Sequence, residues 1–104
     1  MAKLSVLLVC GSGASTGFMA ANMRKAAKEK GLELEIYARS ESEIEVYAED
    51  ANYILLGPHL GYLEDEVKDR VKELGSSAKV FVMDKSYYST LDGAAAIADL
   101  QAHM

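Results

Sequence analysis

Short strand-like and helix-like segments alternate along the whole chain, and this alternation restricts the possible folds more than any other feature. Four apolar runs have the length and composition of strands, at residues 3–9, 32–38, 53–56 and 80–83. Helix-like segments with helically spaced apolar residues lie between and after these runs. Repeated strand–helix units predict a parallel sheet with right-handed crossovers and helices on both faces.

The composition of the individual runs predicts the place of each strand in the sheet. Residues 3–9 read KLSVLLV, as expected of a strand covered on both faces. Residues 32–38 alternate between apolar and polar side chains, which favours a position nearer a sheet edge. We therefore expect an α/β fold with a single four-stranded parallel sheet in the order 2-1-3-4. In this order the chain reverses direction between strands 1 and 3, and such sheets bind ligands at the strand carboxyl ends beside that point.

Glycines and capping residues mark the expected helix boundaries. The first helix is expected over residues 16–30, with Gly31 as its stop. The acidic stretch after strand 2 is predicted to be a short helix, for which Ser40 and Glu43 suggest a capping box. Two further helices are expected over residues 60–74, closed by Gly75, and over residues 92–101.

Length, charge and composition restrict the function classes. The chain has 104 residues, which predicts one domain spanning residues 1–104. No apolar run reaches the roughly 18 residues needed to cross a bilayer. The formal net charge of −5 argues against nucleic acid and anionic lipid as ligands, because both require a basic surface. We expect a monomeric cytoplasmic protein without direct membrane insertion.

The only cysteine, Cys10, ends the first expected strand and begins the segment CGSGASTG. A lone cysteine excludes an internal disulfide and a cysteine-rich zinc site. No metal and no organic cofactor is expected. Cys10 is therefore either a buried structural residue or a reactive thiol, and the glycine-rich sequence that follows it favours the reactive thiol.

The segment after Cys10 has the composition of an anion-binding loop. Small residues let consecutive backbone N–H groups point at one centre, and the following helix adds unpaired donors and the positive end of its dipole. The same groups favour a thiolate, lowering the cysteine pKa from its free value of about 8.5. The residues expected to bind phosphate are Gly11, Ser12, Gly13, Ala14, Ser15 and Thr16.

Three better-known loops differ from this one. The ATP-binding loop requires a Gly-Lys-Ser/Thr ending, and no lysine occurs between Lys3 and Lys25. The dinucleotide fingerprint begins well with Gly11 and Gly13 but has Thr16 in place of its third glycine. Low-molecular-weight tyrosine phosphatases place a cysteine after strand 1 of a similar flavodoxin-like sheet, but carry an arginine six positions later. Thr16 occupies that position here, and its hydroxyl cannot replace a forked guanidinium.

The loop resembles that of the enzyme IIB component of the lactose/cellobiose branch of the bacterial sugar phosphotransferase system. That family has a cysteine ending strand 1, glycine three positions later, serine at five and serine or threonine at six. The matching residues here are Cys10, Gly13, Ser15 and Thr16. The segment Leu55-Leu56-Gly57-Pro58 with Tyr62 also matches the family after strand 3. With the chain length and strand pattern, the resemblance covers nearly the whole sequence.

Two departures from the family pattern leave the nucleophile unchanged. His59 stands where several relatives have glutamine, and Gly11-Ser12 replaces a Ser-Ala pair found in some members. Two roles are open to His59, a hydrogen bond to phosphate or a solvent-facing place at a helix start. Asp84, at the end of strand 4, is expected near the site as an N-cap or as an acid.

The resemblance implies a phosphoryl carrier. Cys10 would take the phosphoryl group from a phosphohistidine of the IIA protein and deliver it to a sugar held by the membrane transporter IIC, with which the chain would associate peripherally. Pro58 and Tyr62 are expected near this site. Phe18, Ala14 and Tyr62 are expected on its rim, although Phe18 would also suit the core.

Two alternatives come from other classes of protein. The first is a cysteine-dependent phosphatase or reductase whose arginine is supplied from elsewhere, such as Arg39 after strand 2. The second is a non-catalytic anion-binding module in which Cys10 is structural. A carrier fits the loop better than a hydrolase does, because the loop lacks both an arginine and an obvious general acid.

Overall fold

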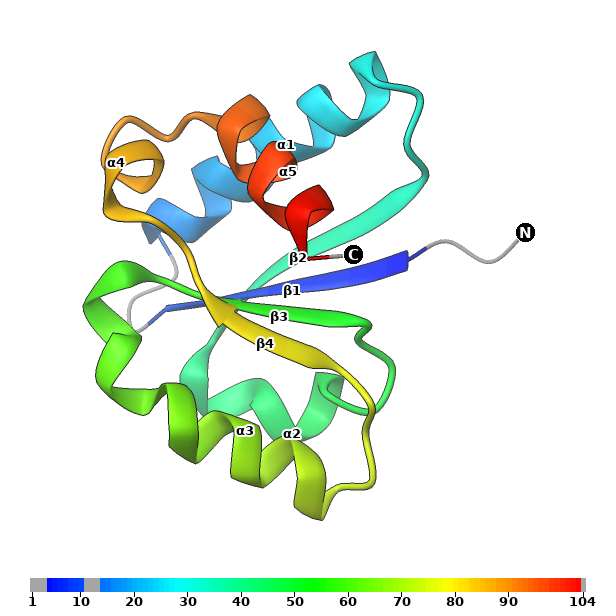
Figure 1. The fold of residues 1–104 in the computed structure, drawn as a ribbon, viewed down its shortest axis with the longest axis vertical. Helices are drawn as coiled ribbons and strands as arrows, with labels where there is room; N and C mark the ends of the chain where they lie inside the picture. The colour runs from blue at the N-terminus through cyan, green and yellow to red at the C-terminus, as the bar shows by residue number, and fades with distance from the viewer. Residues whose placement is uncertain (1–3, 11–13, 104) are drawn as a thin grey trace.

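The computed structural model describes residues 4–10 and 14–103 and shows alternating strands and helices. Figure 1 traces the chain through them. In order they are β1 (Leu4–Cys10), α1 (Ala14–Glu29), β2 (Leu34–Ser40), the 3₁₀ turn η1 (Glu41–Glu43), α2 (Ile44–Tyr47), β3 (Tyr53–Leu56), the 3₁₀ segment η2 (Pro58–Leu63), α3 (Glu64–Glu73), β4 (Lys79–Val82), α4 (Lys85–Tyr88) and α5 (Gly93–Ala102).

The four strands form one parallel sheet in the order β2-β1-β3-β4, which confirms the predicted fold class and strand order. Register pairs Leu4 of β1 with Leu34 of β2 and Val6 with Tyr53 of β3. Because all strands run in one direction, their carboxyl ends meet at one edge of the sheet, at the left in Figure 1. That edge is where the sequence predicts the ligand site.

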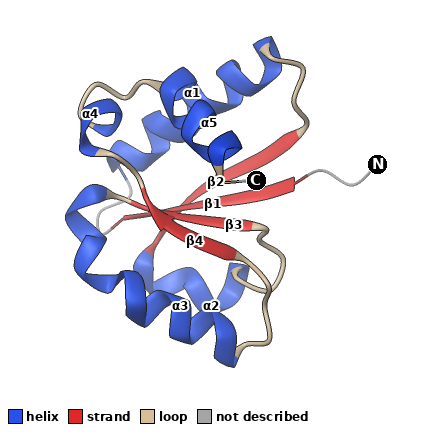
Figure 2. Ribbon diagram, viewed as in Figure 1, coloured by secondary structure: helices blue, strands red, loops and turns tan. Residues whose placement is uncertain are grey.

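Helices cover both faces of the sheet (Figure 2), and each face has its own apolar core. On the α1 and α5 face, Val6 and Leu8 of β1 pack with buried residues of both helices. On the α2 and α3 face, Leu7 and Val9 pack with buried residues of those helices. The central strand is therefore buried on both sides, as its continuous apolar sequence predicts.

The ends of α1 and β2 differ slightly from the prediction. Gly31 has a φ of +72° and stops the helix, as expected. The Leu32 N–H donates to the Ala27 carbonyl at 2.9 Å and so completes the helix end instead of pairing in the sheet. Strand β2 consequently starts at Leu34, two residues after the predicted start, and continues to Ser40.

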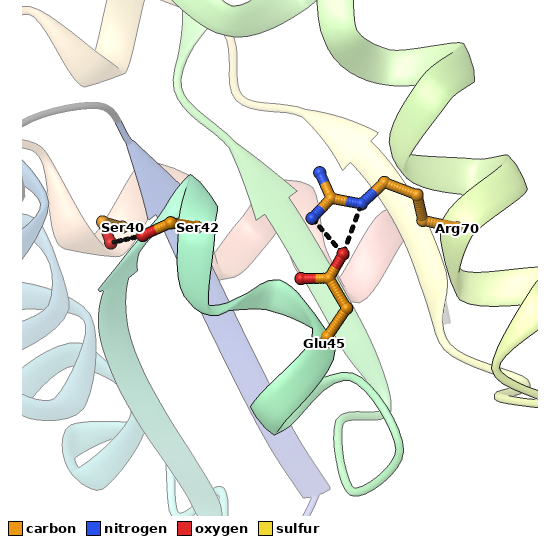
Figure 3. A network of polar contacts seen from close by, with 4 residues as sticks. All are labelled: Ser40, Ser42, Glu45 and Arg70. Atoms are coloured by element: carbon orange, nitrogen blue, oxygen red, sulfur yellow. Dashed lines mark hydrogen bonds and ion pairs between the residues drawn. The ribbon is translucent and has the colours of Figure 1, made fainter.

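The predicted capping box after β2 is not formed among the described residues. The Ser40 hydroxyl pairs with the Ser42 hydroxyl at 2.9 Å (Figure 3). Glu43, the N-cap of α2, makes no side-chain cap hydrogen bond. The short acidic helix is instead fixed from outside, because the Arg70 guanidinium of α3 donates through Nε to Glu45 Oε1 at 2.9 Å. This bond ties α2 to α3 across their shared face of the sheet.

The chain after β3 forms a 3₁₀ segment before it becomes α-helical. Sequence periodicity predicts one helix over residues 60–74, whereas η2 occupies Pro58–Leu63 and α3 occupies Glu64–Glu73. Pro58 starts the 3₁₀ segment with its φ already suitable for a helix, and Gly75 with a φ of +74° follows the end of α3.

Candidate functional site

The carboxyl ends of the three strands β1, β3 and β4 are joined by backbone hydrogen bonds. The Gly57 N–H donates to the Val9 carbonyl at 3.0 Å, which places the start of η2 beside the end of β1. The Met83 N–H donates to the Leu56 carbonyl at 2.8 Å, which places the chain leading to α4 beside the end of β3. The segments after these strands therefore gather around the last residue of β1, Cys10.

Cys10 lies one short connection before the N-terminus of a long helix. Its backbone is the last of β1, in register with Ser40, and α1 begins at Ala14 and runs for 16 residues. The predicted phosphate-binding residues Gly11, Ser12 and Gly13 lie outside the described residues. The side chains of Cys10, Ala14, Ser15 and Thr16 are likewise outside the described part, so the backbone alone places them. This backbone sets a cysteine before unpaired helix N–H groups, as the sequence predicts.

His59 is exposed, and its imidazole folds back over Gly57. A Cβ built on Gly57 would lie 2.7 Å from Cε1 of the His59 ring, so only glycine leaves room for the ring there. The ring also lies at a tilt against Tyr88 of α4, with 6.1 Å between ring centroids. The His59 side chain is exposed, as a solvent-facing role requires, but its ring lies over Gly57 at the end of β3, so this geometry is compatible with both predicted roles.

A cavity of about 320 Å³ lies between η2 and α4 at this edge. It is lined by Pro58, His59, Lys85, Tyr88 and Ser89. The sequence analysis identified Pro58 and His59 as near-site residues but did not single out Lys85. The available signal was its position, since Lys85 directly follows the predicted cap Asp84 at the end of strand 4.

Asp84 acts as a helix cap. Its carboxylate accepts from the Ser86 backbone N–H at 2.8 Å and so caps α4. This backbone hydrogen bond, helped by the Ser86 side chain, lowers the pKa of the Asp84 carboxyl. A carboxyl held ionised in this way is a poor proton donor at neutral pH, so the structure favours the cap over the acid.

The neighbouring Tyr87 is a packing residue. It is buried in the core between the sheet, α1 and α5, and its hydroxyl donates to the Asp99 carboxylate. Burial, followed by this hydrogen bond, raises the pKa of Tyr87. Its hydroxyl is therefore directed into α5.

Arg39 lies within β2, one residue before its end, and not after the strand as predicted, and its side chain is engaged by residues of β2, η1 and α2. Its guanidinium lies 4.9 Å from the ring centroid of Tyr47 and 5.7 Å from that of Tyr37, and its Nε is 3.7 Å from a Glu43 oxygen. Its Nη1 also donates to the Ala38 carbonyl at 2.8 Å. These contacts hold the guanidinium against the aromatic pair of β2 and α2, and Arg39 would have to leave them to act as the arginine of the phosphatase alternative.

Two large apolar side chains are exposed near the strand carboxyl ends. Phe18, in the second turn of α1, has 68% of its surface exposed, and Tyr62, in η2, has 79%. Phe18 therefore does not belong to the core, and its place on the predicted rim stays a prediction. Aromatic residues are enriched on surfaces that other proteins cover.

Neither a metal centre nor a membrane span is found in the part of the chain that the structure describes. Within residues 4–10 and 14–103, no three His, Cys, Asp or Glu side chains are grouped so as to hold a metal ion. No helix over the same residues is both long enough and apolar enough to cross a bilayer.

Fold and site together define a flavodoxin-like α/β protein with a cysteine at the end of its first strand and a helix N-terminus behind it. The family model of the lactose/cellobiose-specific IIB subunit of the PTS system matches residues 5–99. The chain belongs to this family, whose members are components of a sugar phosphotransferase system.

Relatives of known name agree with this assignment. The oligo-beta-mannoside-specific EIIB component of Bacillus subtilis (strain 168) is 30% identical over 88 residues, covering 85% of this chain and 84% of the relative. The galactose-specific EIIB component of Lactococcus lactis subsp. cremoris (strain MG1363) is 31% identical over 88 residues, covering 80% of this chain and 82% of the relative. The chain is therefore a phosphotransferase component of the EIIB type.

Solved structures show the same fold. The lactose-specific IIB domain from Streptococcus pneumoniae superposes with a TM-score of 0.84 and 16% identity, covering 98% of both chains. The cellobiose-specific IIB component from Borrelia burgdorferi superposes with a TM-score of 0.72 and 24% identity, covering 93% of this chain and 87% of that one. The doubly wound sheet is thus the fold of IIB domains.

Proposed function

We propose that this chain is the phosphoryl carrier of a phosphoenolpyruvate-dependent sugar phosphotransferase system, with Cys10 as its phosphorylated residue. Cys10 accepts the group from a phosphohistidine of IIA and passes it to a sugar bound by IIC. The observation that carries this proposal is the backbone position of Cys10, at the end of β1 and just before the 16-residue helix α1. A helix N-terminus there favours both a thiolate and a bound phosphoryl group.

The reaction is an in-line displacement at phosphorus. The Cys10 thiolate attacks, the bond from phosphorus to the imidazole nitrogen of the donor breaks, and the imidazole leaves with the bonding electron pair. Backbone amides of residues 11–16 hold the non-bridging oxygens. Such a transfer needs positioning and charge stabilisation more than side-chain chemistry, so a loop of small residues suffices. The loop sequence contains neither an arginine nor an acidic residue, so the loop itself gives the phosphocysteine no such help towards hydrolysis.

One relative supports the proposed partner on the membrane side. The lactose-specific EIICB component of Lacticaseibacillus casei matches this chain with 27% identity over 73 residues, which make up 13% of that protein. A name that joins C and B supports a IIC transporter as the acceptor side, and a IIA protein as the donor completes the sequence of transfers. On this basis residues 1–104 form one monomeric IIB domain in the cytoplasm, attached to the membrane only through IIC.

Sugar choice is a property of the acceptor partner in this proposal. Relatives at 30%, 31% and 30% identity carry the names of three different sugars, oligo-beta-mannoside, galactose and cellobiose. A carrier that only moves a phosphoryl group needs no sugar pocket, so its sequence need not follow the sugar.

Labelled phosphoenolpyruvate separates a carrier from its alternatives. With the general carrier proteins and a IIA protein present, we expect the chain to acquire one label and to retain it until IIC and sugar are added. A phosphatase would release the label as inorganic phosphate, and an anion-binding module would never acquire it. Gel autoradiography of protein-bound label with a free-phosphate assay measures both outcomes, and either of them would disprove the carrier.

The exposed aromatic rim gives a second test. Changing Phe18 to lysine is expected to slow transfer from phospho-IIA about tenfold, because it places a charge in a contact that excludes water. The melting temperature should stay near that of the wild type, because Phe18 is exposed and is not one of the buried core residues. The matched control is Val46→Lys, at a residue with 69% exposure on α2, the opposite face of the sheet.

The rate of phosphoryl transfer from phospho-IIA and the melting temperature are measured for both variants. A docking role requires that Phe18→Lys accept the phosphoryl group slowly at an unchanged melting temperature, while Val46→Lys accepts it at the wild-type rate. Equal rates in the two variants would exclude Phe18 from the docking surface.

A further inference from the structure

The cavity between η2 and α4 lies at the same edge of the sheet as the end of β1. The Gly57 N–H donates to the Val9 carbonyl, and the His59 ring lies directly over Gly57. Gly57 therefore contacts both the imidazole and the chain one residue before Cys10. Among the cavity walls, His59 belongs to the segment after β3 and Lys85 to the segment after β4, so the cavity joins both segments at the carboxyl edge (Figure 1).

The cavity supplies the kind of charge that the predicted loop lacks. No lysine or arginine occurs between Lys3 and Arg24, so the loop offers only amides, hydroxyls and a helix dipole. A phosphoryl group on sulfur carries close to two negative charges, and its transfer requires their stabilisation. The Lys85 ammonium and the His59 imidazole bring hydrogen-bond donors to the adjacent edge, in a chain with a net charge of −5.

The carboxylate nearest in sequence does not neutralise Lys85. Asp84 is engaged with the Ser86 N–H as the cap of α4. In the part of the chain that the structure describes, no carboxylate forms an ion pair with the Lys85 ammonium. The side chain is exposed and reaches the cavity from the start of α4. It is thus available to an anion that enters from the partner side.

We propose that this cavity is the second wall of the phosphoryl site, in which Lys85 and His59 contact the non-bridging oxygens while the group moves on to or off Cys10. The inference rests on the proposed carrier function and adds two contact residues to it. No bond to Lys85 or His59 forms or breaks. The Cys10 sulfur forms a bond to phosphorus, and the donor imidazole leaves with the electron pair of the broken bond from phosphorus to nitrogen. The Lys85 ammonium offsets the negative charge of the phosphoryl oxygens throughout.

The aromatic wall has a positioning role in the same scheme. The Tyr88 ring meets the His59 ring at a centroid distance of 6.1 Å, and glycine at position 57 provides the space for the imidazole. Together they fix the direction of the imidazole towards the strand ends. Phenylalanine at position 59 keeps the ring packing while it removes both ring nitrogens, which makes His59→Phe an informative variant.

The test compares four purified variants in transfer from phospho-IIA: Lys85→Gln, Lys85→Arg, His59→Phe and Lys79→Gln. Lys79→Gln is the matched control, because Lys79 is an exposed lysine at the opposite end of β4 and its loss changes the net charge equally. We expect Lys85→Gln to slow phosphoryl acceptance at least about tenfold. The loss is smaller than the roughly hundredfold cost of a donor in a closed site, because this cavity is open. Lys85→Arg should stay within about threefold of the wild type, since it keeps the charge.

A second readout needs no phosphoryl donor. Titration of the unphosphorylated protein with inorganic phosphate, followed by amide NMR, should shift the signals of Gly57, His59 and residues 85–89 in the wild type and in Lys79→Gln, and much less in Lys85→Gln. His59→Phe should reduce the transfer rate at an unchanged melting temperature. If Lys85 has only a structural role, Lys85→Gln should show the same phosphate-induced shifts as the wild type, and Lys85→Arg should not keep the wild-type transfer rate.

Two failures are distinguishable. If the wild type acquires no label at Cys10, the proposed function fails and this inference fails with it. If the wild type is labelled at Cys10 while Lys85→Gln and Lys79→Gln are labelled at the same rate, the carrier function stands and the second wall is disproved.

Discussion

Phosphoryl acceptance by the Cys10→Ser variant is expected to fall to background, at least about a thousandfold below the wild type. A thiol beside a helix N-terminus ionises near neutral pH, whereas a serine hydroxyl stays protonated and needs a general base to become a nucleophile. Among the described residues at this edge of the sheet, the Asp84 carboxylate is engaged by the backbone of α4, and the His59 imidazole is proposed to contact the phosphoryl oxygens rather than the side chain at position 10.

The measurement is incorporation of label from phosphoenolpyruvate through the general carriers and IIA, with circular dichroism as the folding check. The isosteric change from sulfur to oxygen should leave the melting temperature nearly unchanged. Cys10→Ala serves as a control that has no nucleophile at all, and its residual label defines the background. Label that persists in Cys10→Ser, at His59 for instance, would contradict the assignment of the phosphorylated residue.

The parts of the fold that the sequence predicts well are those fixed by burial pattern. Strand β3 was expected over residues 53–56 and occupies Tyr53–Leu56, because all four side chains are buried between two helical layers. Gly31 and Gly75 were expected to end helices and have the positive φ that glycine tolerates. The strand order was predicted from the usual topology of doubly wound parallel sheets, in which the chain reverses direction between strands 1 and 3.

Details that depend on tertiary contacts were not predictable in the same way. Strand β2 starts later than predicted because the Leu32 N–H donates to the end of α1. The residue pattern does not show whether this N–H bonds to the helix or to the sheet. The Ser40–Glu43 box failed because the Ser40 hydroxyl pairs with Ser42 at the end of the strand. Local hydrogen bonds of this kind compete with other hydrogen bonds at the strand ends, and the sequence does not show which of them forms.

The same distinction applies to the candidate site. Cys10 and its loop are recognisable in sequence because their chemistry resides in consecutive residues. The cavity beside them is not, because it needs the direction of the His59 ring over Gly57 and the return of Lys85 from a strand two places away. Phe18 shows a third case, since both core and surface suit its position on a helical wheel until packing is known.

The largest stability effect is expected at the crossing of α1 and α5. Gly93, the first residue of α5, packs on the backbone of α1, where an added Cβ would lie 2.3 Å from the Asn22 carbonyl carbon and 2.7 Å from the Met23 nitrogen. Non-bonded carbon atoms normally approach to roughly 3.5–4.0 Å, so the two backbones would have to separate. Asn22 also donates through Nδ2 to the Leu91 carbonyl at 2.7 Å, which ties the turn before α5 to the same point. This anchored contact leaves little freedom to relax.

Gly93→Ala is therefore expected to lower the free energy of unfolding by about 2–4 kcal/mol, although alanine is the better helix former. The matched control is Gly17→Ala in α1, where an added Cβ meets nothing within 4 Å. There the gain in helix propensity acts alone and should raise stability by roughly 0.5–1 kcal/mol. The same substitution is thus expected to lower the free energy of unfolding at Gly93 and to raise it at Gly17. Urea unfolding followed by circular dichroism measures both through the shift of the midpoint at constant slope. Equal stability of the two variants would show that α5 can move away from α1 at little cost, and that the close helix contact does not hold this face of the sheet together.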